Sequence, residues 1–184
     1  MTMRRDFLKL SGAAALAAAL PGCATTGGGS SGRVVVVGGG YGGATAAKYL
    51  RMWSEGGVDV TLVEPNAQFV SCPISNLVVG GSKTIADVTV SYDNLVKRHG
   101  VKLVKDTAVA VDPDKRTVTL ASGQVLPYDR LILSPGIDFM YEQLKALESA
   151  DAQARVLHSW KAGPQTVALR RQLEAMPDGG VYAI

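Results

Sequence analysis

Three glycines at fixed spacing are the first residues of this chain that could do chemistry. Gly38, Gly40 and Gly43 follow the apolar run RVVVV and precede ATAAKYLRMW, in the order G-x-G-x-x-G. In this order the first glycine permits a tight turn, the second lets the backbone approach a pyrophosphate, and the third lets a helix pack on a strand. Free N–H groups at the start of such a helix bind phosphate oxygens. The pattern predicts a dinucleotide-binding loop, in which we include Tyr41 and Gly42.

A carboxylate follows where such a loop requires one. The run VDVTLVE ends at Glu64, 21 residues after Gly43. A carboxylate at this position can accept hydrogen bonds from the ribose hydroxyls of an adenosine. A glycine-rich turn with a surface acid is the alternative, but strand, loop, helix and acid occur here in the required order.

One cysteine remains once the first 24 residues are set aside. Cys72 lies in the stretch FVSCPISN, and Pro73 favours an extended backbone for the residue before it. A thiolate is a nucleophile and could attack an electron-poor ring. An inert, buried cysteine is the common alternative, and the residues alone leave both open.

The elements that must position these residues follow from the hydrophobic pattern. RVVVV is a continuous β-branched run, as expected of a strand buried on both faces of a parallel sheet. TVSYDNLVKRHG predicts a helix that ends at Gly100. Residues 101–136 predict short strands with turns at 112–113 and 122–123. The order predicts an α/β fold of the Rossmann type, a parallel sheet with a small β meander.

The last of these strands carries a further glycine segment. YDRLILSPG resembles the second glycine-bearing segment of two-dinucleotide-fold flavoproteins, in which it returns the chain beneath the flavin pyrophosphate. Ser134, Pro135 and Gly136 stand where that family usually has alanine, threonine and glycine. Together with the downstream order of strands, this segment favours FAD over NAD and adds these three residues to the predicted cofactor contacts.

The first residues predict export. Arg4 and Arg5 precede Phe7, Leu8 and Lys9 in the twin-arginine pattern, and the apolar run that follows is too short to span a bilayer. We interpret residues 1–24 as a signal peptide and 25–32 as a linker, and we expect the protein in the periplasm.

The end of the signal allows two interpretations. LPGC resembles a lipoprotein box, in which Cys23 would be lipidated and would anchor the protein to a membrane. Cleavage near Ala24 without lipidation is the alternative.

Composition and missing motifs exclude other classes. The net charge is +3, and the first 24 residues contribute +2 of it, so no basic patch indicates nucleic acid. The sequence has no Cys-x-x-Cys-His for a c-type haem and no metal-ligand cluster. We interpret His99 as a helix-end cation, and His158 and Trp160 as packing or loop residues.

A narrower resemblance runs from the twin-arginine pattern to residue 184. VVVVGGGYGGATAAKYLR, VTLVEPNAQFVSCPISNLVVGG, YDRLILSPGID and WKAGPQTVALRRQLEAMPDGG resemble the flavoprotein subunit of flavocytochrome c sulfide dehydrogenase. The piece C-x-x-S-N-x-x-x-G-G is the most specific part. In that family the matching cysteine is bonded through sulfur to the 8α-methyl carbon of FAD. The resemblance therefore implies that Cys72 anchors the flavin.

The resemblance also implies an activity. It indicates an FAD-dependent oxidoreductase that takes electrons from sulfide or another small sulfur compound and passes them to a c-type cytochrome subunit. Two alternatives stay open: a sulfide:quinone reductase or other flavin disulfide reductase, and a non-catalytic FAD-binding fragment.

The resemblance further divides the chain. We expect residues 33–160 to form an FAD-binding domain and residues 161–184 to begin a second, truncated nucleotide-type domain, with VYAI as its first strand. In that family the redox-active cysteines lie further along the chain. We therefore expect no catalytic residue in these 184 residues, which would be inactive alone.

Overall fold

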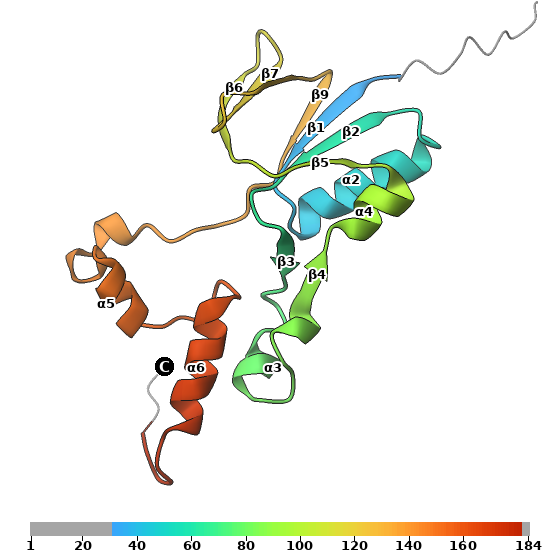
Figure 1. Ribbon diagram of the computed structural model, residues 1–184. Coiled ribbons are helices and arrows are strands. Elements are labelled where there is room, and N and C mark those ends of the chain that lie inside the picture. The colour runs from blue at the N-terminus through green and yellow to red at the C-terminus, as the bar shows by residue number, and fades with distance from the viewer. Residues whose placement is uncertain (1–30, 182–184) are drawn as a thin grey trace, which may run out of the picture.

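A computed structural model describes residues 31–181 (Figure 1). The twin-arginine pattern and Cys23 lie outside the described residues. Four parallel strands form the central sheet in the order β5-β2-β1-β9. These strands are β1 (Arg33–Val37), β2 (Asp59–Val63), β5 (Lys102–Val104) and β9 (Arg130–Leu133). The predicted α/β fold with a parallel sheet is confirmed.

Alternate residues of β1 face two separate cores. Val34 and Val36 pack with Ala47 of α2 (Tyr41–Trp53) on one face of the sheet. Val35 packs on the other face with Val118 of the three-stranded meander. Because both faces are covered, the strand needs apolar β-branched residues at every central position, which explains the run RVVVV. The meander comprises β6 (Ala108–Asp112), β7 (Thr117–Leu120) and β8 (Val125–Pro127).

The second helix beneath the sheet is shorter than predicted. α4 (Asp93–His99) ends as expected at Gly100, which adopts the left-handed conformation with φ 65°. Its predicted first residues instead form the strand β4 (Thr89–Ser91), which pairs antiparallel with β3 (Gln68–Val70). The two strands and the short helices α3 (Asn76–Val79) and η1 (Ala86–Val88) extend past the carboxyl ends of the parallel strands (Figure 1).

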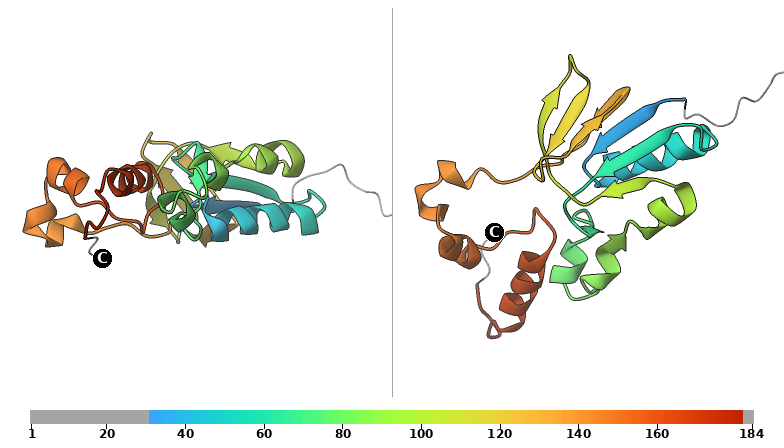
Figure 2. Two further views of the ribbon diagram at one scale, coloured as in Figure 1. Left: turned by 90° about the horizontal axis from the view of Figure 1, so that it is seen from below. Right: turned by 45° about the horizontal axis from the view of Figure 1, so that its top comes forward.

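The chain after β9 leaves the sheet and returns to this extension. It forms η2 (Tyr141–Gln143), η3 (Lys145–Leu147), α5 (Ala150–Arg155) and α6 (Pro164–Glu174). Arg170 of α6 donates from Nη1 to the carbonyl of Val79 at 3.3 Å, at the end of α3. Figure 2 shows α5 and α6 beyond the carboxyl edge of the sheet, away from the meander.

Two sequence-based expectations concern the last residues. Val181 lies in no strand, and residues 182–184 are outside the described part, so the predicted strand VYAI stays a prediction. The division into a domain at 33–160 and the start of another at 161 is likewise a prediction. Among residues 31–181, no helix has the length and apolar character needed to cross a membrane.

Candidate dinucleotide site

The predicted phosphate loop joins β1 to α2 at the carboxyl edge of the sheet. Gly38 has φ 95°, and a Cβ on it would collide with the carbonyl oxygen of Ser134. A Cβ on Gly43 would collide with the carbonyl oxygen of Gly38, because the helix packs closely on the turn. Both glycines are therefore required by the packing of the chain itself.

Gly40 is different from its neighbours in the loop. A Cβ there would meet only Phe69, whose Cε2 is 3.8 Å away, at ordinary van der Waals distance. Gly40 also caps α2 without any side-chain hydrogen bond, and the first turn of this 13-residue helix carries no acidic residue. The start of the helix thus presents its N–H groups and the positive end of its dipole to an anion that approaches Gly40.

Glu64 reaches the loop and holds it in place. Glu64 as a whole is only 8% exposed, and its Oε2 accepts a hydrogen bond from the N–H of Gly39 at 2.7 Å. Its Oε1 accepts from the backbone N–H of Asn66 at 2.9 Å and from Asn66 Nδ2 at 2.7 Å. A carboxylate has about four acceptor positions, so capacity for a ribose hydroxyl remains.

Tyr92 donates a hydrogen bond to the same loop. Its hydroxyl donates to the carbonyl of Gly39 at 3.0 Å, and the residue is 5% exposed. Burial, followed by the charge of Glu64, raises the pKa of Tyr92 to about 12 from the usual 10.0. The hydroxyl therefore stays protonated, and the hydrogen bond stays intact, throughout the physiological pH range.

Replacing Tyr92 with phenylalanine is expected to destabilise the fold by about 1 kcal/mol at neutral pH, because the carbonyl of Gly39 loses its hydrogen-bond donor. The raised pKa adds stability that is complete below the unfolded value of 10.0 and is lost as the pH rises towards about 12. The variant should therefore lose less stability than the parent protein across this interval. Urea unfolding at several pH values measures both effects, with Tyr49→Phe on α2 as the control. If the free energy of unfolding falls equally in the parent protein and in Tyr92→Phe over this interval, Tyr92 does not have the raised pKa.

The return segment lies against the loop. The N–H of Ser134 donates to the carbonyl of Val37 at 2.8 Å, and a Cβ on Gly42 would come within 2.7 Å of Ser134 Oγ. Gly136 has φ 79°, and a Cβ on it would meet nothing within 4 Å. The structure thus brings Ser134 and Pro135 beside the predicted phosphate loop, and Gly136 turns the chain away from it.

A cavity of about 290 Å³ opens beside Gly40, between α2, the β3–β4 hairpin and the start of α4. At its wall the hydroxyls of Tyr41 and Ser71 are 2.5 Å apart in a hydrogen bond, and the ring of Phe69 meets that of Tyr41 edge-on. Phe69 and Ser71 could not be predicted as pocket residues from the sequence, because three-residue strands separated by nearly 20 residues leave no recognisable hydrophobic pattern. We call this space the phosphate pocket; it is lined by Gly39, Gly40, Tyr41, Ala44, Thr45, Lys48, Phe69, Ser71, Val90, Ser91, Tyr92, Asn94 and Leu95.

Cys72 follows Ser71 directly and faces a different part of the chain. It is a free, partly exposed thiol, separated from β2 by the strand β3. Its Sγ donates to the carbonyl of Trp160 at 2.6 Å and lies 4.0 Å from that of Ser159. The thiol therefore contacts the segment that leads into α6.

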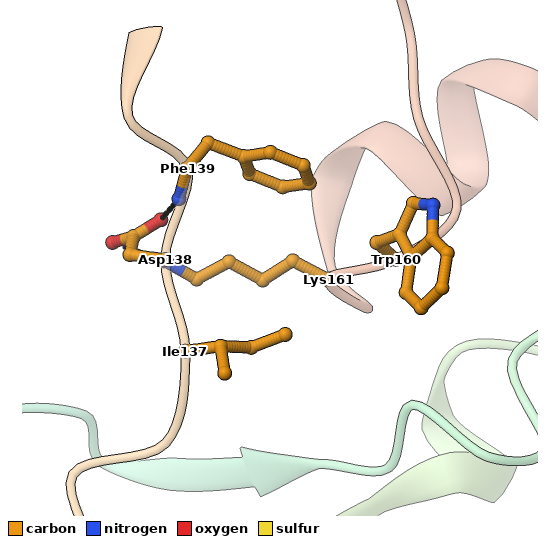
Figure 3. A pocket seen from close by; sticks show the side chains of 5 residues that line it. All are labelled: Ile137, Asp138, Phe139, Trp160 and Lys161. Atoms are coloured by element: carbon orange, nitrogen blue, oxygen red, sulfur yellow. Dashed lines mark hydrogen bonds and ion pairs between the residues drawn. The ribbon is translucent and has the colours of Figure 1, made fainter.

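The same segment forms one wall of a slot of about 100 Å³ (Figure 3). Its five lining residues are Ile137, Asp138, Phe139, Trp160 and Lys161. Lys161 Nζ and Asp138 Oδ2 are 2.8 Å apart and join the two walls. The hydrogen bond to Lys161, with that from the N–H of Phe139, lowers the pKa of Asp138. Burial, assisted by Lys161, lowers the pKa of His158 and favours the neutral imidazole.

The chain's own groups suit a dinucleotide better than a metal ion. The phosphate pocket combines a helix start, two hydroxyls and a glycine that no neighbouring atom requires. Over residues 31–181, no three His, Cys, Asp or Glu side chains gather as metal ligands. A flavin dinucleotide fits these residues because its phosphates need N–H donors and its ring needs apolar walls.

Comparisons with known proteins agree with this geometry. The sequence model of the family described as pyridine nucleotide-disulphide oxidoreductase matches residues 32–165. The model of the twin-arginine translocation pathway signal sequence matches residues 4–21, which confirms the predicted signal.

Individual relatives act on sulfide. A mitochondrial sulfide:quinone oxidoreductase of Dictyostelium discoideum is 28% identical over 107 residues, 58% of this chain and 24% of that protein. The flavoprotein chain of sulfide dehydrogenase [flavocytochrome c] from Chlorobaculum thiosulfatiphilum is 63% identical over 38 residues, 21% of this chain and 77% of that sequence. The solved sulfide:quinone oxidoreductase of Aquifex aeolicus is 26% identical, with a TM-score of 0.61 over 77% of this chain and 31% of that one. The chain thus spans less than a third of the length of the two sulfide:quinone oxidoreductases.

Proposed function

Because the chain belongs to the pyridine nucleotide-disulphide oxidoreductase family, we propose that it is the FAD-binding part of an exported flavoprotein that oxidises sulfide. One observation carries the assignment of a dinucleotide site, and the family favours FAD as the dinucleotide. Cβ atoms on the other four glycines of the loop, at positions 38, 39, 42 and 43, would crowd nearby atoms, whereas a Cβ on Gly40 would meet only Phe69, at 3.8 Å. The chain's own packing gives no reason for a glycine at position 40, and the approach of a pyrophosphate does.

The residues proposed to hold FAD belong to three groups. The loop and the start of α2 would bind the pyrophosphate, and Glu64 would bind the ribose of the adenosine. The return segment would lie beneath the pyrophosphate. The full set is Gly38, Gly40, Tyr41, Gly42, Gly43, Glu64, Cys72, Ser134, Pro135 and Gly136, to which we add Phe69 and Ser71 because they line the phosphate pocket. When bound, FAD accepts electrons in a pair and can release them singly.

Sulfide as the substrate is favoured by the relatives. The 63% identity with a flavocytochrome c flavoprotein chain favours a c-type cytochrome as electron acceptor. Similarity to sulfide:quinone oxidoreductases, over a longer stretch, favours a quinone as the second candidate. The twin-arginine signal directs export, which fits a partner cytochrome outside the cytoplasm.

We further propose that Cys72 carries FAD through a thioether. The thiol is free and partly exposed, and it follows Ser71 at the phosphate pocket. Forming the bond removes the thiol proton and one proton of the 8α-methyl group, and leaves two electrons on the flavin. An acceptor such as dioxygen must take these two electrons, with the two protons, to give hydrogen peroxide and oxidised flavin.

The decisive experiment uses the whole exported flavoprotein, of which this chain would be the FAD-binding part, isolated from the periplasm. We expect a yellow protein that contains FAD, and we expect sulfide to bleach the oxidised flavin absorbance without oxygen. Added c-type cytochrome should then restore the absorbance faster than a water-soluble quinone. Faster oxidation by the quinone would favour the second candidate, and a colourless protein would refute the proposal.

The mature N-terminus has two proposed forms. Lipidated Cys23 would anchor the protein to a membrane, whereas cleavage near Ala24 would release it into the periplasm. Labelling with a radioactive fatty acid separates these forms, because only the lipoprotein incorporates the label and loses it in Cys23→Ala.

A further inference from the structure

Two large apolar side chains are exposed on opposite walls of the slot. The side chain of Ile137 is 77% exposed and that of Trp160 is 70% exposed. A single exposed apolar residue is ordinary in a folded protein. Here both residues line one slot, together with the ring of Phe139 (Figure 3). The slot therefore offers apolar surface on both sides.

The segment that carries Trp160 is fixed at three points. The carbonyl of Trp160 accepts from Cys72 Sγ, and the next residue, Lys161, pairs with Asp138 at 2.8 Å. The N–H of His158 donates to Gln165 Oε1 at 3.1 Å. Trp160 is therefore exposed on a segment that three hydrogen bonds hold in place.

The opposite wall is also held. The ring of Phe139 stacks on Tyr141 with centroids 5.3 Å apart and lies 4.3 Å from the ring of His158. Aromatic contacts of this kind fix the rings against each other. Two held walls with apolar faces suit a flat, rigid ligand, because such a ligand loses little freedom when it enters.

One peptide bond separates the phosphate pocket from the thiol that contacts the segment of Trp160. Ser71 lines the phosphate pocket, and Cys72 contacts the carbonyl of Trp160. A dinucleotide whose phosphates lie at Gly40 and whose ring bonds to Cys72 would bring that ring beside the segment that carries Trp160, because the Cys72 thiol contacts the Trp160 carbonyl.

We propose that Trp160 contacts the isoalloxazine ring of FAD, with its indole against the ring at the mouth of the slot. This inference rests on the proposed function, since it requires FAD bound with its ring at Cys72. Trp160 lies outside the helices and strands, in agreement with its sequence-based interpretation as a packing or loop residue, and flavin contact would be a further role.

Flavin fluorescence tests the contact. An indole in contact with a flavin quenches its emission by electron transfer. The experiment uses the FAD-loaded protein with Cys72→Ser, because a thioether sulfur would itself quench the ring. Adding Trp160→Phe should lengthen the emission lifetime of the bound flavin several-fold, a readout that does not depend on how much FAD is bound. Trp160→Leu, a second variant of this exposed side chain, should do the same.

Trp53 provides a matched control. It is the other tryptophan of the chain, and it is 78% exposed. It is the last residue of α2, and the residues that line the slot lie much further along the sequence. Trp53→Phe should leave the flavin lifetime unchanged. If FAD is bound but the flavin lifetime is unchanged in both Trp160 variants, Trp160 does not contact the ring, and the proposed function still stands. Absence of FAD from the parent protein would overturn the proposed function together with the inference.

Discussion

Replacing Gly40 with valine is expected to give a folded protein that is almost free of FAD. The first added carbon meets only Phe69, at 3.8 Å, so the fold accepts it. The backbone of Gly40 has φ −70° and ψ −166°, which a residue with a side chain also adopts. The branched side chain would however occupy the space that the pyrophosphate needs. We expect binding to weaken at least tenfold, or about 1.4 kcal/mol, as measured by the flavin content of the purified protein and by titration with FAD.

Gly43→Ala is the contrasting variant of the same loop. Its single methyl group would collide with the carbonyl of Gly38, so α2 would have to move away from β1. We expect this smaller change to destabilise the fold by roughly 1–3 kcal/mol, in the range of overpacked cores. Thermal unfolding of both apoproteins separates the two roles. A Gly40→Val protein with normal flavin content would refute the phosphate-loop assignment.

The parallel sheet and its loop could be predicted because local patterns determine them. Val34, Val35 and Val36 are buried on both sheet faces, and burial on both faces is what a continuous β-branched run indicates. Gly100 ends its helix in the left-handed conformation, which glycine adopts at little cost. In both cases the residue type and its immediate neighbours decide the structure.

Contacts between distant segments could not be predicted in this way. The thiol of Cys72 meets the carbonyl of Trp160, 88 residues later, and Arg170 meets the end of α3, 91 residues earlier. Glu64 was expected near the loop, but its hydrogen bond to the N–H of Gly39 depends on how the loop turns. The slot and the phosphate pocket follow from such contacts, so they required the folded structure.

Cys72 is expected to keep FAD on the polypeptide after the protein is unfolded. Hydrogen bonds from the loop and from Glu64 exist only in the fold, so a non-covalent flavin is released by acid or detergent. A thioether survives this treatment. In the parent protein, mass spectrometry of the denatured chain should therefore find the mass of FAD on the peptide that contains Cys72. In Cys72→Ser nearly all of the flavin should be released, although the native variant still binds it.

Cys23→Ala is the matched control for this experiment, since it removes the other cysteine of the chain. It should retain flavin on the denatured polypeptide as the parent protein does. Release of the flavin from both the parent and Cys23→Ala would show that Cys72 makes no covalent bond. In that case the thiol's hydrogen bond to the carbonyl of Trp160 would be its remaining role. Cys72→Ser would then change the stability of the fold by about 1 kcal/mol or less, since a serine hydroxyl can donate to the same carbonyl.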